Sequence, residues 1–315
     1  MLITLQKRRL QLRNPLVTAH GSTTDRHIIE ITARDGDFHG HGEAAPLPGF
    51  GLETFDEALA ALEQWATNPE LLPESPAALS GAATAVENLE KSRLRRSDPK
   101  GAIAVQALVG TPEISLVETQ VSDALANGYL AIKMKVAATD TSTDISRVQA
   151  AAALLGSKAA LRLDANGGWS MRDALAVLSS VDLSHIDLVE EPTSNPLDWR
   201  KINEETGVNI GADEQLTNHL QVGMLLELRA AQTFVLKPSV IGGPLATRRM
   251  AGLAAENGVD ILISSFLDGP IGLRSARDLA LELAPNKIHG LGTAPLFVDE
   301  LPADVQPIDG YLRCS

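Results

Sequence analysis

The stretch NGYLAIKMK, residues 127–135, shows a sequence pattern that recurs along this chain and predicts its architecture. A helical run ends near a glycine, a short apolar segment follows, and polar residues stand at its carboxyl end. Glycine is common just past a helix, because that position often takes a left-handed backbone conformation. The form recurs in GSKAALRLDAN (156–166), TGVNIGADEQ (206–215) and NGVDILISS (257–265). This repetition indicates alternating helices and strands.

The polar residues at the strand ends are regularly spaced. HIDLVEEP (185–192) and AQTFVLKPS (231–239) are strands of the same kind without the glycine. Across the six segments the polar ends step by 29, 26, 23, 24 and 27 residues; they are Lys135, Asp164, Glu190, Asp213, Lys237 and Ser264. Each step matches one unit of a (β/α)8-type barrel, whose active sites lie at the carboxyl ends of the strands. Adding GAIAVQALV (101–109) and KIHGLGTAP (287–295) gives about eight strands.

The first hundred residues show a different pattern. Three strands are predicted where apolar and polar residues mix, at 2–12, 27–34 and 38–44. Two helices are predicted from their periodicity, at 54–66 and 79–94. Strands followed by helices are typical of a small α+β domain. The charged, proline-containing RRSDPKG (95–101) is the expected linker to the barrel.

Composition limits the partners. The 27 basic and 40 acidic residues give a formal net charge of −13, which offers no electrostatic footprint for nucleic acid or an anionic membrane surface. A small molecule is the expected partner. No apolar run approaches the roughly 18 residues of a membrane helix and the N-terminus lacks the long apolar segment of a secretion signal, so a cytoplasmic location is expected. Cys314 is the only cysteine, which excludes an intrachain disulfide and a cysteine metal cluster.

Three carboxylates end successive predicted strands: Asp164, Glu190 and Asp213. Closing the barrel brings them to one side of its mouth, where they repel unless a cation lies between them. A hard divalent ion with oxygen ligands fits such a set, and Mg²⁺ is the natural occupant. One such acid alone is more often a helix cap or a solvated loop residue, but three in phase favour a metal site. Glu190 and Glu191 alternate faces, so periodicity leaves open which of them points inward.

Two lysines, Lys133 and Lys135, share one face of an apolar strand, because residues two apart in a strand point the same way. At about 6.6 Å and an effective dielectric of about 20, their ammonium groups repel by about 2.5 kcal/mol, close to two pKa units. This repulsion would draw one pKa toward the range of a general base, although nearby carboxylates oppose the shift. Lys237 is expected across the barrel mouth. The alternative is that these lysines only extend to solvent at a strand end.

A metal on one side and a base on the other suggest abstraction of a weakly acidic proton next to a carboxylate. The motifs KMK, LDAN, VEEP, ADE and LKP, in this order and spacing, resemble the muconate-lactonising branch of the enolase superfamily. The resemblance implies an α/β fold, a modified TIM-type (β/α)7β barrel with an N-terminal α+β capping domain. The implied domains are 1–98 for the cap, with lid loops near 14–25 and 45–52, and 99–295 for the barrel. Residues 296–315 are expected to pack back on the cap.

Within the branch, the sequence is most similar to the o-succinylbenzoate synthases. The segment GEAAPLPGFGLETFDEA (42–58) resembles their loop over the active site, and Arg162 in LRLDAN is typical of them. The implied reaction is Mg²⁺-dependent syn-dehydration of 2-succinyl-6-hydroxy-2,4-cyclohexadiene-1-carboxylate to o-succinylbenzoate through an enediolate. This is a carbon–oxygen lyase step of menaquinone biosynthesis.

The resemblance also implies a role for each site residue. The Mg²⁺ ligands would be Asp164, Glu190 and Asp213. Lys135 would be the general base, Lys133 its electrostatic neighbour, and Lys237 a cation over the substrate ring, a contact of about 1–2 kcal/mol. The substrate contacts would be Arg162, Asn166, Ser264, Ser265, Gly290 and Gly292. Small residues let backbone N–H groups approach a carboxylate, although the glycines of HGLGT could equally form a tight turn.

Departures from the branch leave alternatives open. In SSFLDGPIG (264–272), Asp268 stands where relatives often have a glutamate, and Gly269–Pro270 where they have serines. Leu291, two residues before Thr293, is flanked by glycines, and the acidic pair with which dipeptide epimerases of the branch hold a substrate ammonium is missing. The alternatives are an N-acylamino acid racemase or dipeptide epimerase and a non-catalytic carboxylate-binding barrel. The sequence leaves the oligomeric state open, and a monomer is compatible with it.

Overall fold

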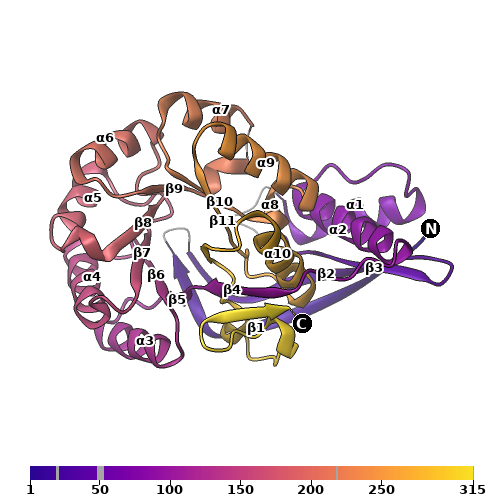
Figure 1. Cartoon of the computed structure of the whole chain (residues 1–315), viewed down its shortest axis with the longest axis horizontal. Helices are drawn as coiled ribbons and strands as arrows, with labels where there is room; N and C mark the ends of the chain where they lie inside the picture. Colours follow the sequence, from indigo (N-terminus) through magenta and orange to yellow (C-terminus); the bar gives the residue numbers. More distant parts are fainter. Residues whose placement is uncertain (19–20, 48–52, 218, 315) are drawn as a thin grey trace.

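The computed structural model describes residues 1–18, 21–47, 53–217 and 219–314. Within these residues, seven strands form one continuous sheet in which every neighbouring pair is parallel. In chain order they are β5 (Ala107–Val109), β6 (Ala131–Lys135), β7 (Ala160–Asp164), β8 (Ile186–Glu190), β9 (Ile210–Ala212), β10 (Thr233–Leu236) and β11 (Asp260–Ile263). The sheet order follows the chain order from β5 to β11, and the sheet is curved (Figure 1).

The ring is completed by β4 (Gly101–Val105) and β12 (Ile288–His289), which pair in parallel. A single parallel bridge between Ser264 and Gly290 joins β12 to β11. β4 and β5 are one stretch interrupted at Gln106, whose N–H donates to the carbonyl of His289 at 2.9 Å. The modified (β/α)7β barrel expected from the sequence is therefore confirmed.

Helices cover the outside of the barrel and connect successive strands (Figure 1). They are α3 (Ile114–Ala126), α4 (Thr141–Leu155), α5 (Met171–Leu178), α6 (Pro196–Thr206), α7 (His219–Leu228), α8 (Pro238–Ile241), α9 (Pro244–Glu256) and α10 (Pro270–Leu283). The local sequence sets their ends. Asp140 accepts a hydrogen bond from the Thr143 N–H at 3.0 Å and begins α4, while Gly207, with φ of 73°, ends α6 in the left-handed conformation.

The N-terminal strands form a separate antiparallel sheet. Its members are β1 (Leu2–Thr18), β2 (Gly21–Asp35) and β3 (Phe38–Ala44), and α1 (Phe55–Thr67) and α2 (Pro76–Arg93) pack on it (Figure 1). The apolar side chains between the sheet and these helices form their own core, which includes Ile29, Ile31 and Trp65. The expected succession of strands and then helices is present, and both predicted helices lie within two or three residues of their observed bounds.

The hairpin of β1 and β2 is longer than the sequence pattern predicted. Leu16 still pairs with Thr23, so the described part of the expected lid loop near 14–25 belongs to β1 and β2. Asn14 and Pro15 interrupt the alternation of polar and apolar residues, and the register shifts between Gln11 and Leu16 to accommodate them. Residues 19–20 and 48–52, which belong to the two expected lid loops, lie outside the described residues.

The C-terminal segment contacts both parts of the chain. Near its start, Phe297 bridges to Leu12 of β1, and the Val298 N–H donates to the carbonyl of Gln11 at 2.8 Å. At its end, β13 (Tyr311–Cys314) pairs antiparallel with β4. Short 3-10 turns complete the description: η1 (Leu183–His185), η2 (Glu214–Thr217), η3 (Ala294–Leu296) and η4 (Ala303–Val305). The boundaries at 98 and 295 stay predictions. Within the described chain, every helix is too short or too polar to span a bilayer.

Candidate active site and metal centre

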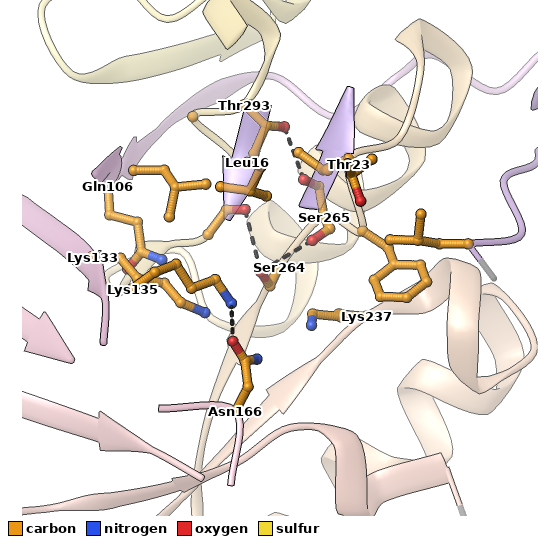
Figure 2. Close-up of a pocket in the computed structure, with 16 residues that line it drawn as sticks. Leu16, Thr23, Gln106, Lys133, Lys135, Asn166, Lys237, Ser264, Ser265 and Thr293 are labelled. Carbon is orange, nitrogen blue, oxygen red and sulfur yellow. Dashed lines mark hydrogen bonds between the residues drawn. The ribbon is translucent and has the colours of Figure 1, made fainter. Parts of the chain in front are cut away.

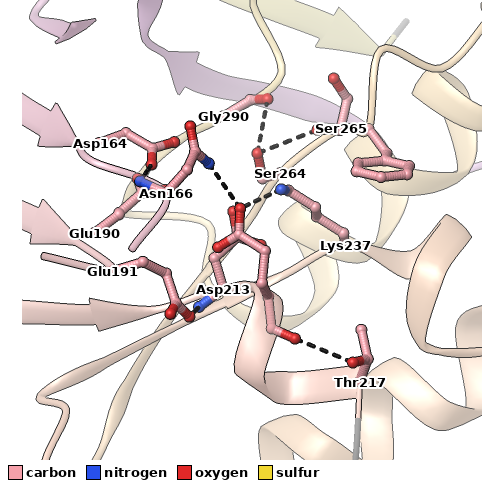
Figure 3. A network of polar contacts seen from close by, with 12 residues as sticks. Asp164, Asn166, Glu190, Glu191, Asp213, Thr217, Lys237, Ser264, Ser265 and Gly290 are labelled. Atoms are coloured by element: carbon pink, nitrogen blue, oxygen red, sulfur yellow. Dashed lines mark hydrogen bonds and ion pairs between the residues drawn. The ribbon is translucent and has the colours of Figure 1, made fainter. Parts of the chain in front are cut away.

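Three buried carboxylates meet at the carboxyl ends of β7, β8 and β9. One oxygen from each of Asp164, Glu190 and Asp213 lies within 4.8 Å of the others (Figure 3). The parallel register brings them together, because Asp164 is paired directly with Glu190 in neighbouring strands. Glu191 turns away with φ of 42°, and its carboxylate accepts hydrogen bonds from the N–H groups of Asp213 and Gln215 at 2.8 and 3.2 Å. Of the pair that periodicity left open, Glu190 therefore joins the cluster.

The three lysines all reach this cluster. The ammonium groups of Lys133 and Lys135 both lie 2.6 Å from the same oxygen, Oδ2 of Asp164. Lys133 also pairs with Glu190. Lys237 Nζ lies 2.5 Å from Oδ2 of Asp213 and enters the pocket from the side opposite Lys133 and Lys135 (Figure 2).

The pKa of Lys133 is decided by the neighbouring carboxylates, which were expected from the sequence to oppose a lowering. Burial lowers its pKa, but the charges of Asp164 and Glu190 outweigh burial and raise the pKa above its ordinary value. Burial likewise raises the pKa of Asp164, and Lys133 with Lys135 more than reverse this, so that the pKa lies well below its usual range. Repulsion between the lysines is the weaker effect, because each ammonium lies in hydrogen-bond contact with a carboxylate.

The residues of the cluster fit a divalent metal ion. All three ligands would be carboxylate oxygens, which suit a hard cation such as Mg²⁺. Oε1 of Glu190 is buried and has no hydrogen-bond partner among the described residues. An unpaired buried carboxylate oxygen is costly, and a bound cation would remove that cost.

A pocket lies between the lysines and the N-terminal sheet. Of the residues predicted for the site, its wall contains Lys133, Lys135, Asn166, Lys237, Ser264, Ser265, Gly290 and Gly292. Three further lining residues lie within the expected lid loops near 14–25 and 45–52: Leu16, Thr23 and Leu47. The sequence did not single out the others, which are Gln106, Leu108, Phe266, Leu267 and Thr293. Among these described lining residues there is no carboxylate.

Asn166 connects the general-base candidate to the rest of the site. Its Oδ1 accepts a hydrogen bond from Lys135 Nζ at 2.9 Å, and its Nδ2 donates to Glu214 at 2.7 Å. The residue has φ of 45°, a left-handed conformation that asparagine tolerates better than most residues. Asn166 is therefore held at both ends of its amide.

The serines and glycines of the pocket are mostly engaged with one another. Ser265 Oγ lies 2.8 Å from Oγ1 of Thr293, and the N–H of Gly290 donates to the carbonyl of Ile263 at 2.8 Å. A Cβ atom on Gly292 would lie 2.2 Å from the carbonyl oxygen of Gln106. Close packing therefore accounts for Gly292, and the N–H of Gly290 serves the sheet and not a ligand.

Arg162 lies in the barrel interior outside the pocket wall. Its Nη1 donates to Gln106 Oε1 and to the carbonyl of Ile288, both at 2.8 Å, and its Nε donates to Asp187 at 2.7 Å. Gln106 lines the pocket, so Arg162 contacts the pocket wall through this residue. Direct binding of substrate by Arg162 stays a prediction.

Some lining residues left a weak signal in the sequence and others left none. Gln106 is a polar residue inside the otherwise apolar GAIAVQALV, which marks it for attention. Leu16 and Leu47 lie within the expected lid loops near 14–25 and 45–52, but no local feature marks these two side chains as the ones that line the pocket.

Comparison with known proteins places the chain in a family. The model of the Enolase C-terminal domain-like family matches residues 116–315, and the chain belongs to this family. The enolase-superfamily membership expected from the motifs is confirmed. The chain is similar to o-succinylbenzoate synthase of Salmonella dublin, with 27% identity over 313 residues that cover 94% of this chain and 87% of the relative.

Solved structures share the fold while differing in reaction. One is a dipeptide epimerase from Enterococcus faecalis V583 complexed with Mg and the dipeptide L-Leu-L-Tyr. Its TM-score is 0.90 at 18% identity, and the match covers 100% of this chain and 96% of the epimerase chain. Muconate lactonizing enzyme from Pseudomonas fluorescens, complexed with muconolactone, has a TM-score of 0.85 at 24% identity over 99% of this chain and 93% of its own. The reaction must therefore be argued from the site.

Proposed function

We propose that this protein catalyses the Mg²⁺-dependent syn-dehydration of 2-succinyl-6-hydroxy-2,4-cyclohexadiene-1-carboxylate to o-succinylbenzoate, a carbon–oxygen lyase step of menaquinone biosynthesis. The observation that carries the proposal is a pocket with lysines on two sides and no carboxylate among the described residues of its wall. Such a wall suits a substrate whose charged groups are all carboxylates. The 27% identity to o-succinylbenzoate synthase over most of the chain supports the same reaction.

The carboxylates Asp164, Glu190 and Asp213 would hold the metal ion. When bound there, Mg²⁺ supplies positive charge that stabilises the enolate form of the substrate carboxylate and lowers the pKa of the neighbouring lysines. All three carboxylates are buried, so their charges act in a medium of low dielectric, where electrostatic effects are strong.

The proton transfers are assigned to Lys135. As a neutral amine, its Nζ takes the proton from the carbon next to the substrate carboxylate. As the resulting ammonium, it gives that proton to the hydroxyl that leaves as water, while the carbon–oxygen bond breaks and the ring becomes aromatic. One group acting twice from one face produces syn elimination. Asn166, at 2.9 Å from Nζ, orients the amine.

The other lysines supply charge. Lys133 lies beside Lys135 on β6 and contacts Asp164 and Glu190, whose charges raise its pKa, so it keeps a positive charge next to the reacting carboxylate. Lys237 lies over the ring of Phe266 at 5.1 Å from Nζ to the ring centroid, on the other side of the pocket. A substrate ring between these groups would have a cation on each face.

The test is loss of the diene's ultraviolet absorbance on addition of purified protein with Mg²⁺, compared with the same protein after treatment with EDTA. We expect turnover only with the metal. A sample that binds Mg²⁺ and yet leaves the absorbance unchanged would contradict the proposal.

Racemisation of N-acylamino acids is the second candidate. The observation in its favour is that Lys135 and Lys237 enter the pocket from opposite sides (Figure 2), since racemisation needs a base on each face of the α-carbon. Exchange of the α-proton of N-succinyl amino acids for deuterium, without diene turnover, would favour this candidate. Dipeptide epimerisation fits less well, because no carboxylate of the described pocket wall could hold a substrate ammonium.

A further inference from the structure

A second set of buried charged groups lies where β2 and β3 meet the loop between β11 and α10. Arg26 is 1% exposed, Glu43 4% and Asp268 1%. We propose that Arg26 and Glu43 are positioning residues that clamp the loop 264–269 to the segment 45–47, so that the two form one wall of the substrate pocket. The inference rests on the proposed assignment of that pocket to the substrate.

The guanidinium of Arg26 joins the two segments directly. Its Nη1 donates to the carbonyl of Pro46 at 2.7 Å, and its Nη2 donates to that of Ala45 at 2.6 Å. On the other side, Nε donates to the carbonyl of Leu267 and Nη2 to that of Phe266, both at 3.2 Å. A planar group with five N–H donors can reach four carbonyls at once, and neither lysine nor glutamine can do so.

Glu43 fixes the beginning of α10 from outside the barrel. Its carboxylate accepts hydrogen bonds from the N–H groups of Gly269 at 2.6 Å, Ile271 at 3.2 Å and Gly272 at 3.3 Å. The N-cap residue of this helix, Gly269, has no side chain to do this. A Cβ atom on Gly269 would lie 2.7 Å from Glu43 Oε2, so the close approach requires glycine at the position where relatives often have a serine.

The clamped segments carry pocket residues. Phe266 and Leu267 line the pocket from the barrel loop, and Leu47 lines it from the N-terminal part of the chain. The Phe266 ring also lies near both cations, with Arg26 Cζ at 5.8 Å and Lys237 Nζ at 5.1 Å from its centroid. Because Lys135 is held by Asp164 at the end of β7 and by Asn166 just after it, loosening this wall should weaken substrate binding more than proton transfer.

The first measurement is hydrogen–deuterium exchange of the peptide that covers residues 264–275, which does not depend on catalysis. We would compare Arg26→Gln and Glu43→Gln with the controls Arg34→Gln and Glu30→Gln, which change β2 residues that are more exposed. We expect exchange in this peptide to rise about tenfold or more in the two clamp variants and to match wild type in the controls. With exchange measured above about pH 8, where the Glu43 carboxyl is ionised, Glu43→Gln leaves one accepting oxygen in place of two, so part of the helix start loses its partner.

The second measurement is steady-state dehydration. The clamp variants should raise KM about tenfold with kcat within about threefold of wild type, and Arg26→Lys should recover part of the loss because it keeps the charge and some donors. Unchanged exchange, a fall in kcat at unchanged KM, or protection lost evenly over the whole chain would overturn the proposal. If wild type turns over no diene, the proposed function fails, while the exchange measurement still decides whether the clamp exists.

Discussion

Two groups of buried charged residues in this molecule differ in the partners of their charges. We call Asp164, Glu190 and Asp213 with Lys133, Lys135 and Lys237 the mouth cluster, and Arg26, Glu43 and Asp268 the junction. In the mouth cluster, carboxylates contact ammonium groups of side chains. At the junction, Arg26 donates to backbone carbonyls and Glu43 accepts from backbone N–H groups.

Because their partners differ, the pKa of Asp164 in the mouth cluster and the pKa of Glu43 at the junction shift in opposite directions. Burial raises the pKa of Asp164, but the ammonium groups of Lys133 and Lys135 outweigh it and hold the pKa well below its usual range. Burial and the charge of Asp268 raise the pKa of Glu43 to about 8, because its backbone donors are neutral and compensate less. Side-chain partners can be exchanged for a metal or a substrate without moving the chain, and backbone partners cannot. From this difference we infer that the mouth cluster binds the metal and substrate and that the junction holds the pocket wall in place.

The largest expected effect comes from Lys135→Ala. Turnover of the diene should fall about 10²–10⁴-fold, which is the usual contribution of a general acid–base residue. The melting temperature should change little, because Lys133 remains against the same oxygen of Asp164. The measurement is kcat together with thermal unfolding, with Lys201→Ala, an exposed lysine of α6, as the control. If the protein were only a carboxylate-binding barrel, the variant would keep its ligand response and there would be no turnover to lose.

The next effect concerns the metal. Glu190→Gln should lower Mg²⁺ affinity by about 100-fold or more, since even residues that only support metal ligands contribute about 10–100-fold. Isothermal titration calorimetry with Mg²⁺ measures this directly. The control is Glu204→Gln on the exposed face of α6, which should bind Mg²⁺ like wild type. Wild-type affinity in Glu190→Gln would mean that the unpaired Oε1 of Glu190 is not a ligand.

The sequence predicted the mouth cluster because of a simple property of parallel sheets. The carboxyl ends of parallel strands meet at one edge, so a polar residue ending each strand predicts a common site from spacing alone. Asp164, Glu190 and Asp213 are brought together in this way, and Lys237 lies beside the last of them. Their catalytic and metal-binding roles stay predictions that the experiments above test.

The sequence could not predict the contacts of the junction, although it did predict lid loops near 14–25 and 45–52, which contain the lining residues Leu16, Thr23 and Leu47. Arg26 contacts Phe266 and Leu267, about 240 residues away in the chain, and no local period encodes such a contact. The sequence also left open whether repulsion between the lysines or attraction to the carboxylates decides the Lys133 pKa, since this depends on distances to Asp164 and Glu190 that spacing does not give. The sequence pattern also did not predict that β1 continues past Pro15, because a register shift lets the strand continue beyond Asn14 and Pro15.

His289 tests whether neutral hydrogen-bond partners favour the neutral form of a buried side chain outside the junction as well. His289 of β12 accepts a hydrogen bond from the Ile263 N–H at 3.0 Å through Nδ1, and its Nε2 lies 2.9 Å from the carbonyl of Ala284, to which it donates. Burial lowers the pKa of His289 to about 4. Between about pH 4 and 6.5 the unfolded chain therefore binds a proton that the folded chain excludes, so stability rises with pH across this window, by about 3 kcal/mol in total.

The variant His289→Gln should remove that dependence. Glutamine offers an amide N–H donor group and a carbonyl acceptor but does not titrate, so the slope of unfolding free energy against pH should fall by up to about 1.4 kcal/mol per pH unit between pH 4 and 6.5. Denaturant unfolding at several pH values measures the slope, with His39→Gln, an exposed histidine of β3, as the control. An unchanged slope would show that the neutral partners of His289 do not exclude its proton.

The smallest expected effect tests whether Gly292, at the mouth of the barrel, is needed for packing or for ligand binding. A Cβ atom on Gly292 would meet the backbone oxygen of Gln106 at 2.2 Å, so Gly292→Ala should destabilise the fold by about 1–3 kcal/mol even without ligand. Gly252 of α9 has nothing within 4 Å of its added Cβ, and Gly252→Ala should stabilise by up to about 1 kcal/mol because alanine favours helix. Urea unfolding of both metal-free variants measures the difference. If Gly292→Ala instead kept wild-type stability and lost only substrate affinity, Gly292 would be a ligand contact, as the family resemblance implies.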